Sequence, residues 1–244
     1  MILKEPSENK YNHIPLSNDF GNWWYFGRKE ILKRLLLRQK FTSNINILEI
    51  GPGVGVNIEV LQNFGSVDIL EVDYYFIELI EKNHKLKINK VYKDFSKIEK
   101  KYDLIIFLDV LEHIENYEFF IQEVDKIMKD RGIGIMSVPA YQKLFSQHDK
   151  NLHHYRRYNW KLIKKHLEPY FKVINKIGYN FLLLPVRFIQ IKIINSDISD
   201  TTVSPILNFI LTTIIKFEVL LFRLNLNLKF GLSLFAVFEK ENDK

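Results

Sequence analysis

Residues 44–61, NINILEIGPGVGVNIEVL, hold the pattern that decides the fold. The apolar run at 45–50 predicts a short buried strand. Three glycines follow at alternate positions, and the apolar residues after them predict a helix over 56–64 that ends at Gly65. Glycine-rich turns of this kind hold nucleotides in several unrelated protein classes, so the chemistry of the ligand has to be read from the residues around the turn.

The alternation of strands and helices continues on both sides of this turn. Apolar runs predict further strands at 67–73, 101–110 and 132–139. Periodic patterns predict helices from about 28 to 40, at 75–84 and at 116–129. Strands separated by helices pair in parallel, so we expect an α/β fold, a doubly wound Rossmann-like sheet covered on both faces. Ligands bind such sheets beyond the carboxyl ends of the strands.

The last third of the chain predicts two more strands with an insertion between them. Residues 170–179 and 231–240 read as the sixth and seventh strands, which pair antiparallel. Residues 180–228 are apolar at helical spacing but interrupted by charges, and neither apolar segment has the near 20 uninterrupted residues of a membrane span. We expect two amphipathic helices that form a lid, a dimer interface or a membrane contact.

Length and composition limit the class of protein. The 244 residues suit a single domain over 1–244, with residues 1–42 as an N-terminal helical cap. With no cysteine, thiolate metal sites and cysteine nucleophiles are excluded. The net charge of +6 is spread without a basic and aromatic cluster, so we expect no nucleic-acid partner. The charged N-terminus predicts a cytoplasmic location. A membrane contact through 180–228 would place the protein at the inner face of the membrane. The sequence does not indicate an oligomeric state.

One missing glycine argues against a dinucleotide. The dinucleotide turn needs a third small residue, but Val56 or Ile58 occupies that position here. The pattern is instead an acid, Glu49, followed by Gly51, Gly53 and Gly55. This arrangement suits a ligand that brings an ammonium group and a sulfonium to the turn and has no phosphate there.

Several motifs together resemble one enzyme family. ILEIGPGVG at 47–55, the acid Asp73, KDF at 93–95 and YDLIIFLDVLEHI at 102–114 are similar to the ordered motifs of class I S-adenosylmethionine-dependent methyltransferases. WWYFGRKEIL at 23–32 and SVPAYQKLFSQHDKNLHHYRRYN at 137–159 resemble the branch that acts in surface-glycan and lipid-carrier pathways. The resemblance implies S-adenosylmethionine as the cofactor and methyl transfer to a hydroxyl of a sugar or lipid-linked glycan. The alternatives are a small lipid or quinone-like phenol as acceptor, or a catalytically silent cofactor-binding partner subunit.

The resemblance also implies a role for each residue of the cofactor site. The three glycines would let the backbone pass against the methionine part of the cofactor, and Glu49 would face its amino group. An unpaired charge in so apolar a run would be costly, which favours a functional partner for Glu49. Asp73, about 20 residues beyond the glycines, would accept hydrogen bonds from both ribose hydroxyls.

Four further residues complete the implied cofactor site, each with a structural alternative. Asp94 would take the adenine amino group with Phe95 beside the base, although KDFS also reads as an Asp-initiated turn. Asp109 would lie near the reacting methyl group, or cap the helix after it. Arg28 would pair with the methionine carboxylate, or be an ordinary helix-surface residue.

The proton of a hydroxyl acceptor calls for a general base, and histidine has a suitable pKa. His148 is the first candidate because it follows the fourth strand most closely and Asp149 could orient it, and His154 is the second. The alternative is that these histidines only tie down a loop. Their spacing matches no familiar metal-ligand pattern, so we expect no metal. We expect His113 to pack behind the third strand.

Overall fold

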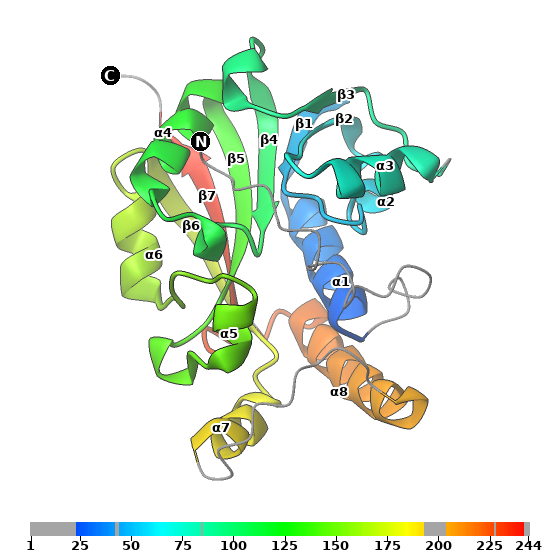
Figure 1. Ribbon diagram of the computed structural model, residues 1–244, viewed down its shortest axis with the longest axis vertical. Helices are drawn as coiled ribbons and strands as arrows, with labels where there is room; N and C mark the ends of the chain where they lie inside the picture. The colour runs from blue at the N-terminus through cyan, green and yellow to red at the C-terminus, as the bar shows by residue number, and fades with distance from the viewer. Residues whose placement is uncertain (1–22, 42–43, 84, 193–203, 227, 242–244) are drawn as a thin grey trace.

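A seven-stranded sheet organises the chain in the order β3-β2-β1-β4-β5-β7-β6 (Figure 1). The computed structural model describes residues 23–41, 44–83, 85–192, 204–226 and 228–241. The strands are β1 (Ile45–Ile50), β2 (Gly65–Leu70), β3 (Lys90–Tyr92), β4 (Tyr102–Leu108), β5 (Met128–Pro139), β6 (Phe171–Tyr179) and β7 (Ser233–Lys240). Only β7 runs antiparallel to its neighbours, β5 and β6. The α/β, Rossmann-like sheet with an antiparallel last strand is therefore confirmed.

Helices cover both faces of the sheet. The α-helices are α1 (Trp23–Arg38), α2 (Ile58–Leu61), α3 (Tyr74–Lys82), α4 (Tyr117–Ile127), α5 (Gln147–Asn151), α6 (Trp160–Leu167), α7 (Leu184–Lys192) and α8 (Pro205–Arg223). Short 3₁₀ helices are η3 (Phe95–Lys97), η4 (Leu111–His113) and η5 (Gln142–Leu144). One buried cluster joins α4 and α6 to one face, and a second joins α1, α2, α3 and α8 to the other. Each face of the sheet is thereby removed from water, which is the main stabilising term of the fold.

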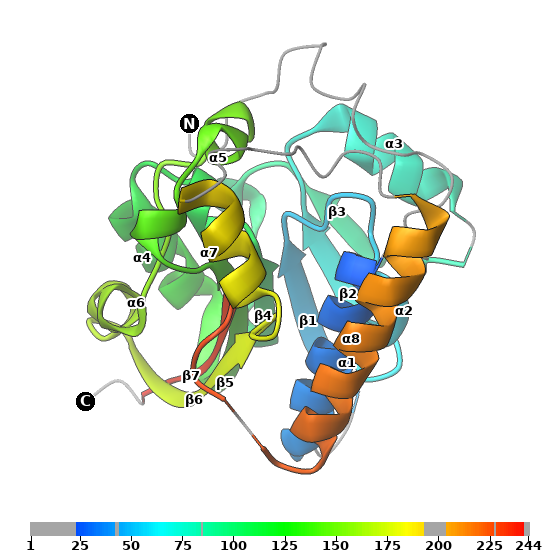
Figure 2. The ribbon, with the colours of Figure 1, turned by 90° about the horizontal axis from the view of Figure 1, so that it is seen from below.

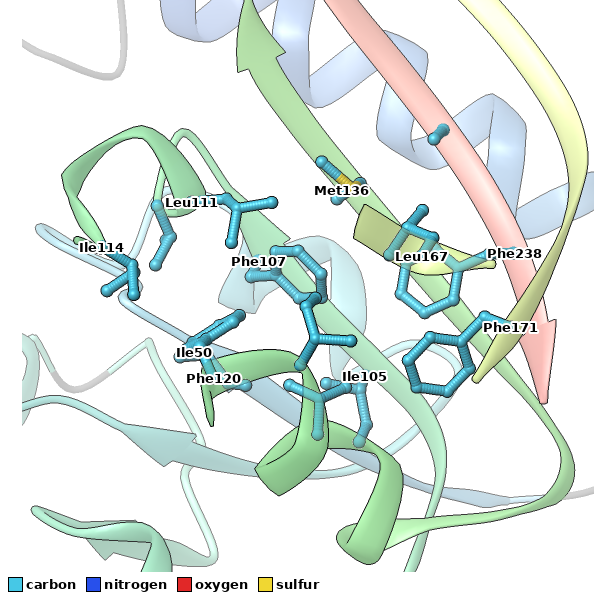
Figure 3. Packing of buried hydrophobic residues seen from close by; sticks show 14 of the residues in the cluster. Ile50, Ile105, Phe107, Leu111, Ile114, Phe120, Met136, Leu167, Phe171 and Phe238 are labelled. Carbon is cyan, nitrogen blue, oxygen red and sulfur yellow. The ribbon is translucent and has the colours of Figure 1, made fainter. Parts of the chain in front are cut away.

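Aromatic rings fill the core beneath α4 and α6 (Figure 3). Phe107 of β4 lies edge-on to Phe120 of α4, with ring centroids 5.3 Å apart, and contacts Phe238 of β7 at 5.8 Å. Phe238 also contacts Phe171 of β6. These packed rings tie three strands to one helix.

The expected element boundaries need three corrections. Helix α1 starts at Trp23 and not near 28, because Asn208 of α8 accepts a 3.0 Å hydrogen bond from the Trp23 backbone N–H. Helix α2 ends at Leu61, and Gly65 is the first residue of β2, where it pairs with Ile45. Glycine is required there because a Cβ would lie 1.9 Å from the Ile45 carbonyl oxygen. The three-residue strand β3 went unpredicted, since an exposed first residue and one buried residue give no strand pattern.

The two helices α7 and α8 occupy the segment between β6 and β7 (Figure 2). Helix α8 packs along α1 through Ile215, Val219 and Phe222, which are buried. By length and composition alone, α8 is long and apolar enough to cross a membrane, and this corrects the expectation that neither segment qualifies. Its charges, at 216, 218 and 223, all fall in its second half, which leaves 205–215 uncharged.

Candidate active site

The glycine turn between β1 and α2 adopts a conformation that side chains rarely tolerate. Gly51, Gly53 and Gly55 have φ values of +64°, +56° and +79°. A Cβ on Gly51 would lie 2.8 Å from a methyl group of Val110, and one on Gly55 would press on apolar side chains. A Cβ on Gly53 would meet nothing within 4 Å among the described residues. The space in front of Gly53 is therefore where a ligand can approach the backbone.

Glu49 is an acid buried beside this turn. It is 2% exposed, and one carboxylate oxygen accepts a 2.8 Å hydrogen bond from the Asn57 side chain. The other oxygen, Oε2, has no partner among the residues that the structure describes. Burial raises the pKa of Glu49 to about 7, although the Asn57 hydrogen bond and Arg28 oppose the rise. An oxygen in this state is suited to receive a cationic or hydrogen-bonding ligand group.

Glu71 is the acid at the carboxyl end of β2, and the sequence prediction missed it. The strand ends at Leu70, three residues before Asp73. The Glu71 carboxylate accepts backbone N–H groups of Gly53 (3.3 Å), Val72 (2.9 Å) and Asp73 (3.0 Å), so it lies directly against the glycine turn. Asp73 instead caps α3, accepting the Tyr75 N–H at 3.0 Å. The strand therefore ends three residues earlier than the predicted 67–73, and Asp73 begins the helix that follows it.

Arg28 and Asp109 bind each other at the end of β4. Arg28 Nη1 lies 2.6 Å from Asp109 Oδ2, and the Ser137 hydroxyl donates to Asp109 Oδ1 at 2.7 Å. Asp109 has a φ of +55°, which directs the chain away from the strand at this point. Arg28 Nε is buried without a partner in the described part of the chain. The Arg28 side chain is therefore mostly buried against Asp109 and does not lie on the helix surface.

The other two predicted cofactor contacts lie beyond β3. Asp94 is exposed and caps η3, where its carboxylate accepts the Ser96 N–H at 2.7 Å, and this hydrogen bond lowers the pKa of Asp94. The ring of Phe95 is buried edge-on to Phe120, with centroids 5.7 Å apart. The exposed carboxylate of Asp94 can still meet a ligand, whereas the Phe95 ring belongs to the core.

The histidine that Asp149 orients is His154, and not His148 as the sequence analysis expected. Asp149 Oδ1 accepts hydrogen bonds from His154 Nδ1 and from Arg157 Nε, each 2.8 Å long. Burial would raise the pKa of Asp149, but the hydrogen bonds from His154 and Arg157 outweigh it and hold that pKa below its usual range. An anionic carboxylate can only accept hydrogen bonds, so the neutral His154 ring carries its proton on Nδ1. Its other nitrogen, Nε2, can then accept a proton.

A second acid lies beside this histidine. Ligand atoms of Glu112, His113 and His154 all lie within 4.8 Å of one another, and the His113 and His154 rings are 4.6 Å apart. His113 therefore lies beside His154, whereas the sequence predicted that it packs behind the third strand. Burial and Asp109 raise the pKa of Glu112 well above its usual value. This trio has the side-chain types of a metal site, an alternative that the spacing along the chain did not indicate. His148 lies on α5, partly buried.

The raised pKa of Glu49 predicts a pH-dependent stability. Its ordinary value is 4.5 and its folded value is about 7, so between these pH values the folded state keeps a proton that the unfolded state loses. Stability is therefore lost as pH rises through this window. We expect Glu49→Gln to raise the unfolding free energy of the unliganded protein by about 3 kcal/mol at pH 8 and to leave it almost unchanged at pH 4.5.

Urea unfolding at both pH values measures this difference. Glu59→Gln is the matched control, because the Glu59 side chain is half exposed and pairs with Lys29 on the surface. An equal gain in unfolding free energy at both pH values, or no gain at pH 8, would show that the charge of buried Glu49 does not destabilise the unliganded protein.

Comparison with known proteins identifies the family. A methyltransferase domain matches residues 23–173, more than half of the chain. The chain belongs to this methyltransferase domain family. The expected class, an S-adenosylmethionine-dependent methyltransferase of class I architecture, is thereby confirmed at the level of the family.

Two relatives are similar to part of this chain. Ubiquinone biosynthesis O-methyltransferases from Pelagibacter ubique and Rickettsia canadensis are 31% and 30% identical over 116 and 135 residues. These matches cover 43% and 48% of this chain. The chain spans about half the length of these relatives, 48% and 57%.

Solved structures share the fold over almost the whole chain. The N-methyltransferase NodS from Bradyrhizobium japonicum, in complex with S-adenosylhomocysteine, has a TM-score of 0.60 at 15% identity and covers 96% of this chain and 100% of its own. An S-adenosylmethionine-dependent methyltransferase from Clostridium acetobutylicum has a TM-score of 0.57 at 14% identity and covers 91% and 93%. At these identities the similarity is one of fold.

Proposed function

We propose that this methyltransferase transfers the methyl group of S-adenosylmethionine to a hydroxyl oxygen of a lipid-soluble phenol. The observation that carries the proposal is the pairing of His154 with Asp149 and Arg157, which leaves a proton-accepting nitrogen beside Glu112. A hydroxyl acceptor needs such a base, whereas an amine can lose its proton later. The O-methyltransferase names of the relatives support an oxygen acceptor, and their connection with ubiquinone favours a phenol over the sugar that the sequence analysis preferred.

The glycine turn and its acids fit the cofactor. Gly53 offers open space against the backbone, and Glu49 offers an unpaired carboxylate oxygen for the amino group. We assign a ribose hydroxyl to Glu71 in place of Asp73, because Glu71 lies at the strand end and, among the described residues, its Oε2 accepts a single hydrogen bond, from the Gly53 N–H. Asp94 remains the candidate for the adenine amino group.

The reacting end of the site lies between Asp109 and His154. When bound, S-adenosylmethionine supplies a methyl group that its sulfonium already activates, so alignment of the acceptor contributes most of the rate. The acceptor oxygen forms a bond to the methyl carbon while the carbon–sulfur bond breaks with its electron pair left on sulfur. His154 Nε2 receives the hydroxyl proton, and Asp149 stabilises the imidazolium that results. Arg28 holds Asp109 in place and offers its unpaired Nε to the methionine carboxylate.

A direct assay tests the acceptor class. Purified protein is incubated with S-adenosylmethionine carrying a labelled methyl group and, separately, with a catechol bearing a short prenyl chain, the same ring as an aniline, and a methyl glycoside. We expect label in a phenolic ether, identified by mass spectrometry, and none in the amine. Label in the glycoside alone would show that the acceptor is a sugar. Label in the amine would contradict the role of His154 as the base.

The same proposal assigns the outer face of α7 and α8 to a lipid surface. Apolar side chains of α8 at three- and four-residue spacing face away from α1, and Ile206 and Phe209 are 75% and 72% exposed. Val186, Phe188 and Ile189 of α7 are exposed as well. The two helices contain four cationic residues, Arg187, Lys192, Lys216 and Arg223. Arg223 pairs with Glu30 of α1, and the acid of α8, Glu218, is buried. Exposed apolar side chains on helices that also carry cations match a surface of anionic lipid.

Vesicle flotation tests the lipid surface. We expect the protein to float with vesicles of anionic phospholipid at low salt, and binding to weaken at high salt as ions screen the cations. Exchange of Ile206 and Phe209 for serine should abolish flotation, whereas Phe119→Ser, on α4 and 42% exposed, should not. Protein that stays in solution with anionic vesicles at low salt would contradict the membrane contact and favour a dimer interface.

A further inference from the structure

The ends of β6 and β7 carry polar side chains that the proposed reaction does not use. Tyr179 closes β6, Asn180 follows it, and Ser233 opens β7 opposite Tyr179 in the register. All three residues are at most 2% exposed. Both hydroxyls and both side-chain amide atoms of Asn180 lack a hydrogen-bond partner within the described residues.

Four unpaired polar atoms at one strand junction call for an explanation. Buried polar atoms in folded proteins are almost always paired, because burial removes the water that would otherwise bind them. The same junction includes Pro139 at the end of β5, which lies opposite Ser233. In doubly wound sheets such strand ends are where ligands bind, so a ligand group is the natural partner of these atoms.

The sheet register connects this junction to the reacting end of the site. Residues paired across antiparallel strands point to the same face, so Ser233 and Tyr179 share a face with Pro139. Ser137 lies two residues before Pro139 and points to that face as well. Its hydroxyl binds Asp109. Ser137, Ser233 and Tyr179 therefore form a row on one face of the sheet, and Asp109 binds the first of them.

Helices α1 and α8 fix the far end of this row. The Tyr179 hydroxyl lies so close to Gly27 of α1 that a Cβ there would come within 1.7 Å of it, and Arg28 is the next residue along the helix. Glu218 of α8 accepts the Leu182 N–H at 2.8 Å and so holds the turn that follows β6. Asn180 has a φ of +59° in that turn. The backbone of the junction is thus anchored, while its side-chain polar atoms stay unpaired.

We propose that Tyr179, Asn180 and Ser233 bind a second, neutral hydroxyl group of the acceptor, next to the hydroxyl that is methylated. This inference rests on the proposed function. Two hydroxyls and an amide offer both donors and acceptors, and a hydroxyl is the simple ligand group that uses both. The three side chains carry no charge to offset the burial of a carboxylate or phosphate. A site built to hydrogen-bond such a group rejects the analogue that lacks it.

Catechol and phenol are the probe pair, and Tyr179→Phe and Ser233→Ala are the variants. Thermal shift in the presence of S-adenosylhomocysteine measures acceptor binding without turnover, and kcat/KM measures selectivity. We expect wild-type protein to be stabilised by catechol more than by phenol, and each variant to lose at least tenfold of the catechol-over-phenol ratio in kcat/KM. Affinity for S-adenosylhomocysteine should stay within twofold.

Stability separates a ligand site from a structural role. Removal of an unpaired hydroxyl should not lower the Tm of the unliganded protein, whereas Tyr102→Phe should lower it, because the Tyr102 hydroxyl binds buried Asp68 at 2.7 Å. Tyr102→Phe should keep the wild-type selectivity. A fall in Tm with unchanged selectivity in the two variants, or no discrimination by wild-type protein, would overturn the proposal. Catechol binding that depends on these residues, without methyl transfer, would instead contradict the proposed function alone.

Discussion

His154→Ala should lose about 100- to 10,000-fold in turnover and bind S-adenosylmethionine with unchanged affinity. Asp149, held anionic, fixes the tautomer in which Nε2 of His154 accepts a proton. Without the imidazole, the acceptor hydroxyl has no adjacent base, although alignment still contributes. Steady-state kinetics with a saturating phenol, together with calorimetric titration of the cofactor, separates the two effects.

His148→Ala is the control for this prediction. His148 lies on the same short helix as Asp149, but the Asp149 carboxylate holds His154. We expect His148→Ala to change turnover by less than about tenfold. The reverse ranking of the two variants would transfer the base to His148, and normal turnover in both would leave the reaction to positioning.

Glu71→Gln should weaken cofactor binding by about 1.5 to 3 kcal/mol, which is roughly 10- to 150-fold in Kd. Glu71 Oε1 already accepts two backbone N–H groups, whereas Oε2 accepts the Gly53 N–H and has room for one charge-assisted hydrogen bond from a ribose hydroxyl. Calorimetric titration with S-adenosylhomocysteine measures the change.

Asp73→Asn distinguishes the two acids at the end of β2. Asparagine is as good an N-cap as aspartate, so α3 should keep its start at Tyr74 and the affinity should change by less than about threefold. If Asp73→Asn lost the affinity and Glu71→Gln kept it, the ribose would belong to Asp73, as the sequence analysis predicted.

The architecture could be predicted from the sequence because its signals are local. Runs such as INILEI and YDLIIFL are buried along their length, and the helices between them carry periodic apolar faces. The start of α1 could not be predicted, since its cap is Asn208, which is 185 residues away along the chain. Contacts of this range leave no local pattern.

Site residues could be predicted where the backbone conformation requires a particular residue type. They were harder to predict where the role of a side chain depends on which group it hydrogen-bonds. Three positive φ values require glycine at the turn, so the turn was found. Glu71 and Asp73 are only two residues apart, and a strand boundary predicted from sequence is uncertain by about that much. The end of the apolar run at Leu70 was the signal that pointed to Glu71. The partner of Asp149 depends on how α5 and the loop after it fold, which spacing alone does not fix.

The central claim is that the glycine turn, Glu71 and His154 form one active site. A crystal structure with S-adenosylhomocysteine and catechol tests it most directly. We expect a ribose hydroxyl on Glu71, the amino group beside Glu49, and a catechol oxygen within hydrogen-bond distance of His154 Nε2. A ribose bound to Asp73, or a catechol bound away from His154, would contradict it.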